Sequence, residues 1–169
     1  MLKPERQLLK HFLATLAYRT EKTLRQRPPE FENYRPAPGV RTPYQLLSHM
    51  NDVLHFALGQ FGKTVERTPE TDFDCAIEGF YEILQTLGKK LEDDTANGPD
   101  SARLLQGPFS DVMAHAGQLA MLRRLCGSPI PPENFHGANI SSDNLTAAQA
   151  AATHPFGEWR DAEGNPQHP

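Results

Sequence analysis

Cysteine, long apolar runs and an excess of basic charge are all scarce in this chain. The only two cysteines, Cys75 and Cys126, lie far apart and form no CxxC pair. Residues 1–6 lack the apolar run of a secretory signal peptide. Charged residues interrupt every hydrophobic segment well before the roughly 20 apolar residues that cross a bilayer. These absences predict a soluble protein in a reducing, cytoplasmic setting, without a membrane span.

The charge balance argues against nucleic acid as a partner. Lysine and arginine number 17, aspartate and glutamate number 21, and the formal net charge is -4. Because the two signs are mixed along the chain, the release of counterions that drives nucleic-acid binding would be weak. The sequence also has no Ser/His/Asp nucleophile pattern and no glycine-rich phosphate loop. We therefore expect a small-molecule substrate.

The length of 169 residues suits one domain whose core needs no disulfide or structural metal. The 15 prolines and 12 glycines imply that ordered elements share the chain with substantial loop. We expect residues 1–130 to form the domain and residues 131–169 to form a C-terminal tail that packs on it or extends from it.

Apolar residues recur every three or four positions in four segments, which predicts an all-α fold without a sheet. The expected helices cover about residues 4–26, 42–61, 71–93 and 108–126. Four amphipathic helices imply a four-helix bundle, in which each helix buries its apolar stripe against the others.

Capping residues mark several helix ends. Thr42 and Gln45 predict a capping box at the start of the second helix, and Thr71 or Asp72 caps the third. The fourth is expected to begin at Gly107-Pro108, because proline suits the first position of a helix. In the tail, Thr146 to Gln149 is a second capping-box pattern, which would open one short helix. We interpret the tail aromatics as packing residues that hold the tail against the bundle, namely Phe135, Phe156 and Trp159.

Two residues four apart on the fourth helix, Asp111 and His115, project from one face and can share a ligand. The alternative is a surface pair in which Asp111 benefits from the positive end of the helix dipole. His115, however, lies between apolar rows, where a solvated imidazole is not expected. His49 is similarly placed on the second helix. Together the three residues form a His/Asp/His set that a bundle can bring together in its core.

The other histidines fit this set less well. His55 lies six positions after His49, about 120° further around the helix, so both cannot readily point at one ion. His11 lies among polar neighbours, and the remaining three lie in the tail, namely His136, His154 and His168.

The segments 104–129 (LLQGPFSDVMAHAGQLAMLRRLCGSP) and 43–52 (PYQLLSHMND) resemble the DinB-like (YfiT-like) metal-dependent family. The similarity covers about residues 4–130. It implies a bundle of up-down-down-up connectivity, in which one histidine of the second helix and an HxxxH pair of the fourth bind a divalent metal. His49 and His115 match that pattern, whereas Asp111 replaces the first histidine of the pair.

A His/His/Asp set with open positions suits nickel, zinc, iron or manganese. Asp52 and Gln118, each one turn beyond a histidine, are placed to orient the ligands or bound water. Arg123 and Arg124 end the fourth helix, where we interpret them as favourable partners of the helix dipole rather than substrate ligands.

The resemblance implies a metal-assisted hydrolase or a thiol transferase that uses a low-molecular-weight thiol, since a divalent ion lowers the pKa of bound water or thiol. Members of the family often dimerise through bundle faces, and the apolar surplus of the first helix would allow a homodimer here. The alternative is a non-catalytic bundle, with a structural metal or none, that acts through partner or ligand binding. Three protein ligands favour the enzyme, because structural sites are usually closed by four.

Overall fold

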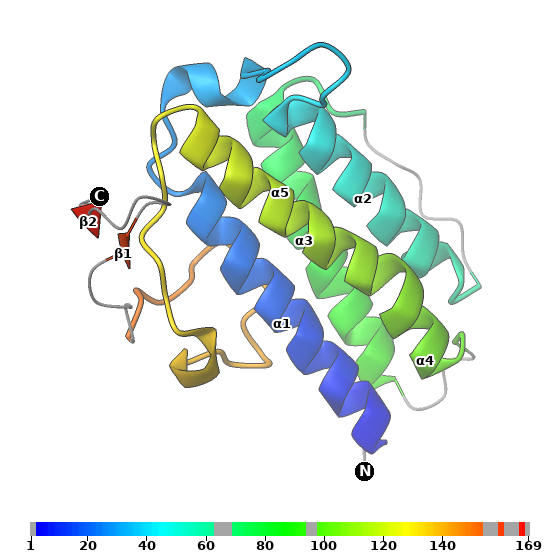
Figure 1. Cartoon of the computed structure of the whole chain (residues 1–169). Helices are drawn as coiled ribbons and strands as arrows, with labels where there is room; N and C mark the ends of the chain where they lie inside the picture. The colour runs from blue at the N-terminus through cyan, green and yellow to red at the C-terminus, as the bar shows by residue number, and fades with distance from the viewer. Residues whose placement is uncertain (1–2, 63–68, 94–97, 154–158, 161–165, 168–169) are drawn as a thin grey trace.

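The computed structural model describes residues 3–62, 69–93, 98–153, 159–160 and 166–167. Four long helical segments pack side by side, which confirms the all-α class and the bundle (Figure 1). The first three are α1 (Pro4–Leu24), α2 (Pro43–Gly59) and α3 (Phe73–Glu92). In the described residues no helix is both long and apolar enough to cross a membrane.

The expected caps of the second and third helices are present. Thr42 Oγ1 accepts the Gln45 backbone N–H at 3.2 Å, and Gln45 Oε1 accepts the Thr42 N–H at 3.1 Å. Asp72 rather than Thr71 caps α3, where its carboxylate accepts the Cys75 N–H at 2.8 Å. These side chains satisfy amide groups that have no partner within the helix, so each start is fixed by local chemistry.

The fourth helical segment kinks at Gly107, where the sequence predicts the helix to start, and a short helix that was not predicted precedes this point. The segment consists of α4 (Ser101–Leu104), a π-helical turn (Leu105–Phe109) and α5 (Ser110–Leu125). Asp100 caps it by accepting the N–H groups of Ala102 and Arg103. Pro108 lies inside the helix because Gly107, at φ -98° and ψ -105°, leaves the helical region and makes room for the proline ring. The wide turn thus accommodates a residue that usually starts a helix.

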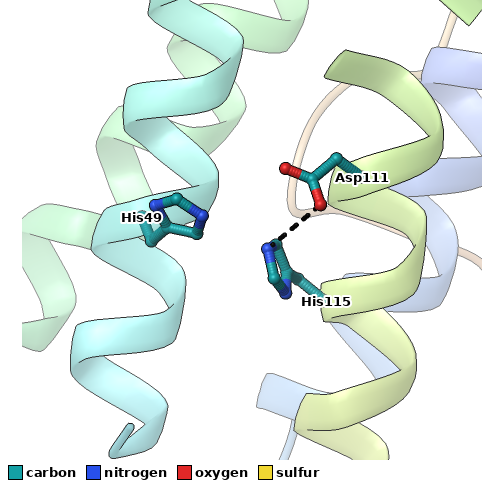
Figure 2. Close-up of side chains that lie close together, drawn as sticks. All are labelled: His49, Asp111 and His115. Atoms are coloured by element: carbon teal, nitrogen blue, oxygen red, sulfur yellow. Dashed lines mark ion pairs between the residues drawn. The ribbon is translucent and has the colours of Figure 1, made fainter. Parts of the chain in front are cut away.

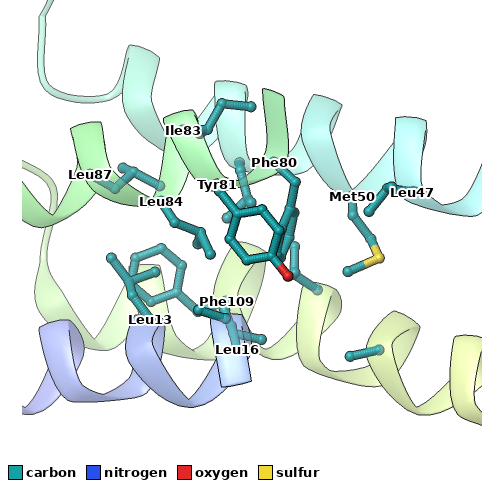
Figure 3. Packing of buried hydrophobic residues seen from close by; sticks show 14 of the residues in the cluster. Leu13, Leu16, Leu47, Met50, Phe80, Tyr81, Ile83, Leu84, Leu87 and Phe109 are labelled. Carbon is teal, nitrogen blue, oxygen red and sulfur yellow. The ribbon is translucent and has the colours of Figure 1, made fainter. Parts of the chain in front are cut away.

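Each helix contacts two others, so that α1 and α2 occupy one diagonal of the bundle and α3 and α5 the other. The core between them is apolar (Figure 3). The partly buried Phe12 packs against it and stacks on Phe109, with ring centroids 6.3 Å apart. The fully buried residues come from all four segments, among them Leu13, Leu47, Leu84 and Phe109. This core does not include the polar residues between α2 and α5, namely His49, Asp111 and His115.

The first part of the tail packs on the bundle. The Glu133 side chain is fully buried, accepts the Tyr18 hydroxyl at 2.7 Å and pairs with Lys22 at 2.6 Å. Burial and this carboxylate raise the pKa of the Tyr18 hydroxyl. Leu145 packs over Gly88, where an added Cβ would lie only 2.3 Å from a Leu145 methyl carbon. Because Gly88 has no side chain, the tail can pack closely against the surface of α3 at this point.

The tail also corrects two predictions. Residues 146–149 form no helix: Thr146 Oγ1 accepts the Ala148 N–H, and the Gln149 side chain donates to the Asn144 and Thr146 carbonyls instead of capping. The only helical turn in the described tail is at Phe135–Gly137. A sheet was not expected, yet β1 (Trp159–Arg160) and β2 (Pro166–Gln167) form a minimal antiparallel pair.

The tail aromatics have different outcomes. Phe135 packs as predicted, with its ring edge-on to Tyr18 and the Arg19 guanidinium 4.1 Å from its centroid. Trp159 lies in β1. Phe156, His154 and His168 lie outside the described residues. The packing prediction is therefore confirmed at Phe135.

Candidate metal centre

Helix α5 supplies two of the three predicted ligands. Asp111 and His115 are one turn apart and point from α5 toward α2 (Figure 2). The closest pair of atoms, Asp111 Oδ1 and His115 Nε2, is 3.4 Å apart. Asp111 lies in the first turn of α5, just beyond the kink at Gly107, so the positive end of the helix dipole also favours its carboxylate.

Helix α2 supplies the third residue, His49, from the opposite side of the gap (Figure 2). The His49 and His115 rings lie edge to face with centroids 4.9 Å apart. One ligand atom each from His49, Asp111 and His115 lie within 4.8 Å of one another. The prediction that these three side chains converge from two helices is confirmed.

The spacing is slightly wider than in a closed metal site. Two atoms that are each about 2.1 Å from one ion are at most about 4.2 Å apart. The group must therefore contract by less than about 1 Å to hold an ion, and the Asp111 side chain, half exposed at 50%, can move toward the histidines. Such a change requires no movement of the backbone.

Gln118 holds the His115 ring. Its side-chain oxygen lies 3.1 Å from His115 Nδ1, so it can accept the Nδ1 proton and leave the Nε2 lone pair free to bind a ligand. The contact predicted for Gln118 is therefore present. Across the described part of the chain, Nε2 finds no hydrogen-bond partner although it is buried. A buried imidazole nitrogen that makes no hydrogen bond is available to bind a metal ion.

Among the described histidines, His11, His55 and His136 lie outside this group, as predicted for His55. His55 lines a separate cavity of about 280 Å³ between α2 and α3, together with Glu70 and Cys75. His11 instead contacts Ser142 of the tail at 3.0 Å. Within the described ranges, the His49, Asp111 and His115 group is the one set of side chains spaced to hold a metal ion.

An open cavity of about 690 Å³ adjoins the group on the Asp111 side. Its wall contains Asp52, which the sequence analysis placed near the ligands, and the π-helical turn through Gly107 and Pro108. Phe56, 63% exposed, lines it as well and was not predicted. The signal was available in the sequence: Phe56 falls outside the apolar stripe of its helix, but on the face of His49 and Asp52.

Arg123 has a role that the sequence analysis missed. It is only 4% exposed and its guanidinium donates to the carbonyls of Thr23, Arg25, Gln26 and Ser128. These acceptors lie at the end of α1 and just beyond α5, so Arg123 ties the two helix ends together. The helix-dipole interpretation is too weak for this residue, since four carbonyls receive its hydrogen bonds.

Comparisons of the chain with protein-family models, with curated proteins and with solved structures found no match. The chemistry of the centre therefore follows from its own atoms. Two imidazole nitrogens and one carboxylate oxygen form a donor set that suits a divalent transition metal. Three donors from two helices leave at least one coordination position for water or another small molecule.

Proposed function

We propose that the chain binds one divalent metal ion through His49, Asp111 and His115 and uses it in hydrolase or thiol-transferase chemistry on a small molecule. The observation that carries this proposal is the buried Nε2 of His115, which makes no hydrogen bond and faces the Asp111 carboxylate at 3.4 Å and the His49 ring. A purely structural role would leave that nitrogen unsatisfied, at a typical cost of about 1–3 kcal/mol.

The surrounding residues fit an open rather than a closed centre. Asp111 is half exposed and lies in the wall of the cavity, so a small molecule can reach the centre from that side. A divalent ion supplies a nucleophile near neutral pH by lowering the pKa of bound water or thiol. Gln118 keeps His115 in the tautomer that binds through Nε2, and Asp52 offers a second carboxylate that can accept a proton near the reacting group.

Membership of the DinB-like family and its up-down-down-up connectivity belong to the same proposal. The support is the resemblance of segments 43–52 and 104–129, together with a ring of contacts in which α2 packs between α3 and α5. Nickel, zinc, iron and manganese remain the expected ions. A low-molecular-weight thiol, a homodimer and a cytoplasmic location stay predictions.

Elemental analysis of protein purified without chelator or an affinity metal tests the proposal. We expect about one equivalent of a divalent metal in the wild type and a large loss in His115→Ala. His55→Ala is the matched control, since His55 is on the same helix as His49 but lines another cavity. Equal metal content in all three proteins, or none in the wild type after addition of each ion, would overturn the proposal.

A further inference from the structure

A second cavity lies about one helical turn from the centre, and none of the three proposed ligands lines it. It has a volume of about 550 Å³ and lies between α5 and the segment that precedes α2. Gln118, which contacts His115, and Leu46, one turn before His49, both line it. The cavity and the metal centre are therefore neighbours along the gap between α2 and α5.

The walls of this cavity are apolar and exposed. Val40, Met121 and Leu125 line it, and they are 38%, 50% and 52% exposed. They are three of the five large apolar side chains that are exposed in the described part of the chain. Because exposed apolar side chains gathered around a hollow mark binding sites more often than singly scattered ones, this end of the gap is suited to an apolar group.

The one charged side chain in the lining is Arg41. Among the described residues no hydrogen bond or ion pair engages its guanidinium, whereas nearby Arg35 is held by the Val40 carbonyl and by Gln45. A guanidinium beside an apolar hollow binds carboxylates through two parallel hydrogen bonds. The cavity on the Asp111 side has the opposite charge, since its ionisable lining residues are Asp52 and Asp111.

We infer that the substrate of the proposed metal centre is an amphipathic carboxylate, with its carboxylate at Arg41, an apolar middle against Met121 and Leu125, and its reactive group at the metal. The inference rests on the proposed function for the metal-bound end only. The distance between the two sites suits such a molecule. At about 1.5 Å per residue, His49 lies about 9 Å along α2 from Pro43, which follows Arg41 by two residues. A chain of several carbon atoms covers that separation.

The first test needs no metal. Hexanoate and hexanamide are titrated into chelator-treated protein and followed by calorimetry and by amide chemical shifts. Hexanoate is expected to bind about five- to tenfold more tightly than hexanamide and to shift signals around Val40 and Leu125. Arg41→Gln should remove this preference, and Arg124→Gln, which changes the same charge outside the cavity, should retain it.

The second test probes the metal centre and the Arg41 site with one molecule. Suberic acid monohydroxamate, which can chelate a metal at one end and present a carboxylate at the other, is compared with its methyl ester on protein loaded with nickel. The free acid should bind about tenfold more tightly in the wild type and equally in Arg41→Gln.

The outcomes separate the two proposals. If neither hydroxamate binds but hexanoate still prefers wild type over Arg41→Gln, the metal proposal fails and the carboxylate site stands. If acid and neutral probes bind alike, or if Arg41→Gln changes nothing, the carboxylate inference is overturned. Dissociation of a dimer by Leu125→Ser, without binding of any probe, would assign this face to a contact between two copies of the chain and also overturn it.

Discussion

Among single residues, Asp111 is the proposed ligand that the structure makes easiest to test, because it is exposed and holds no part of the core. Replacing it with alanine removes one of three donors, so Asp111→Ala should weaken metal affinity by at least about tenfold. Asp111→His should restore binding, since an imidazole can donate from the same position. Isothermal titration with nickel and zinc measures both effects.

The neighbouring Asp52 provides a control for charge. It lines the same cavity as Asp111 but lies outside the group whose ligand atoms converge. Asp52→Asn should therefore change metal affinity less than Asp111→Ala does. An equal loss in the two variants would mean that the cavity attracts the ion through its net charge rather than through Asp111 as a ligand.

At the scale of elements, Arg123 fixes how α5 meets α1. Burial lowers the pKa of its guanidinium from the ordinary value, and the hydrogen bonds to four carbonyls offset the cost of that burial. Arg123→Met should lower the free energy of unfolding by about 3 kcal/mol, because it leaves the buried Thr23 carbonyl and three partly buried carbonyls without this donor. Chemical denaturation followed by circular dichroism measures this change.

Arg124→Met on the same helix is the matched variant, because Arg124 is exposed. Its effect should stay within about 0.5 kcal/mol. If the two variants were equally stable, the tie between the helix ends would contribute nothing, and the packing of α5 on α1 would rest on the apolar core alone.

For the whole molecule, we expect the bundle to fold without metal. Apolar side chains from all four helical segments form the core, while the centre joins only α2 and α5. An ion present at about 100 times its dissociation constant stabilises the folded state by about 2.7 kcal/mol. Chelation should therefore lower the melting temperature by roughly 5–10 °C for a chain of this size and preserve the helical circular dichroism spectrum.

Complete unfolding of the chelated protein at room temperature would have a different meaning. The metal would then hold the fold together, as in small zinc domains, and the non-catalytic alternative would gain at the expense of the enzyme. His115→Ala provides an independent check. If the ion is a cofactor rather than a structural element, this variant should fold and bind no metal. Its near-ultraviolet spectrum should match that of the chelated wild type.

Local chemistry made much of this architecture predictable. The 3.6-residue repeat of apolar residues located the helices, and side-chain caps such as Thr42 and Asp72 fixed their starts to within two residues. The short helix α4 before Gly107 could not be predicted in this way. Pro108 favours a helix start by its own geometry, and the segment does kink at Gly107, but α4 and a wide turn extend it toward the N-terminus.

The apolar repeat alone indicates which residues of the centre face inward, since His49 and His115 lie on the apolar flanks of their helices. That these two flanks meet is a property of the folded bundle. Helical periodicity specifies the buried face of each helix but not the helix that this face contacts, which depends on long-range packing. The same packing placed Arg41 beside Met121 and Leu125, although these residues lie far apart in the chain. The carboxylate site is for this reason visible only in the folded molecule.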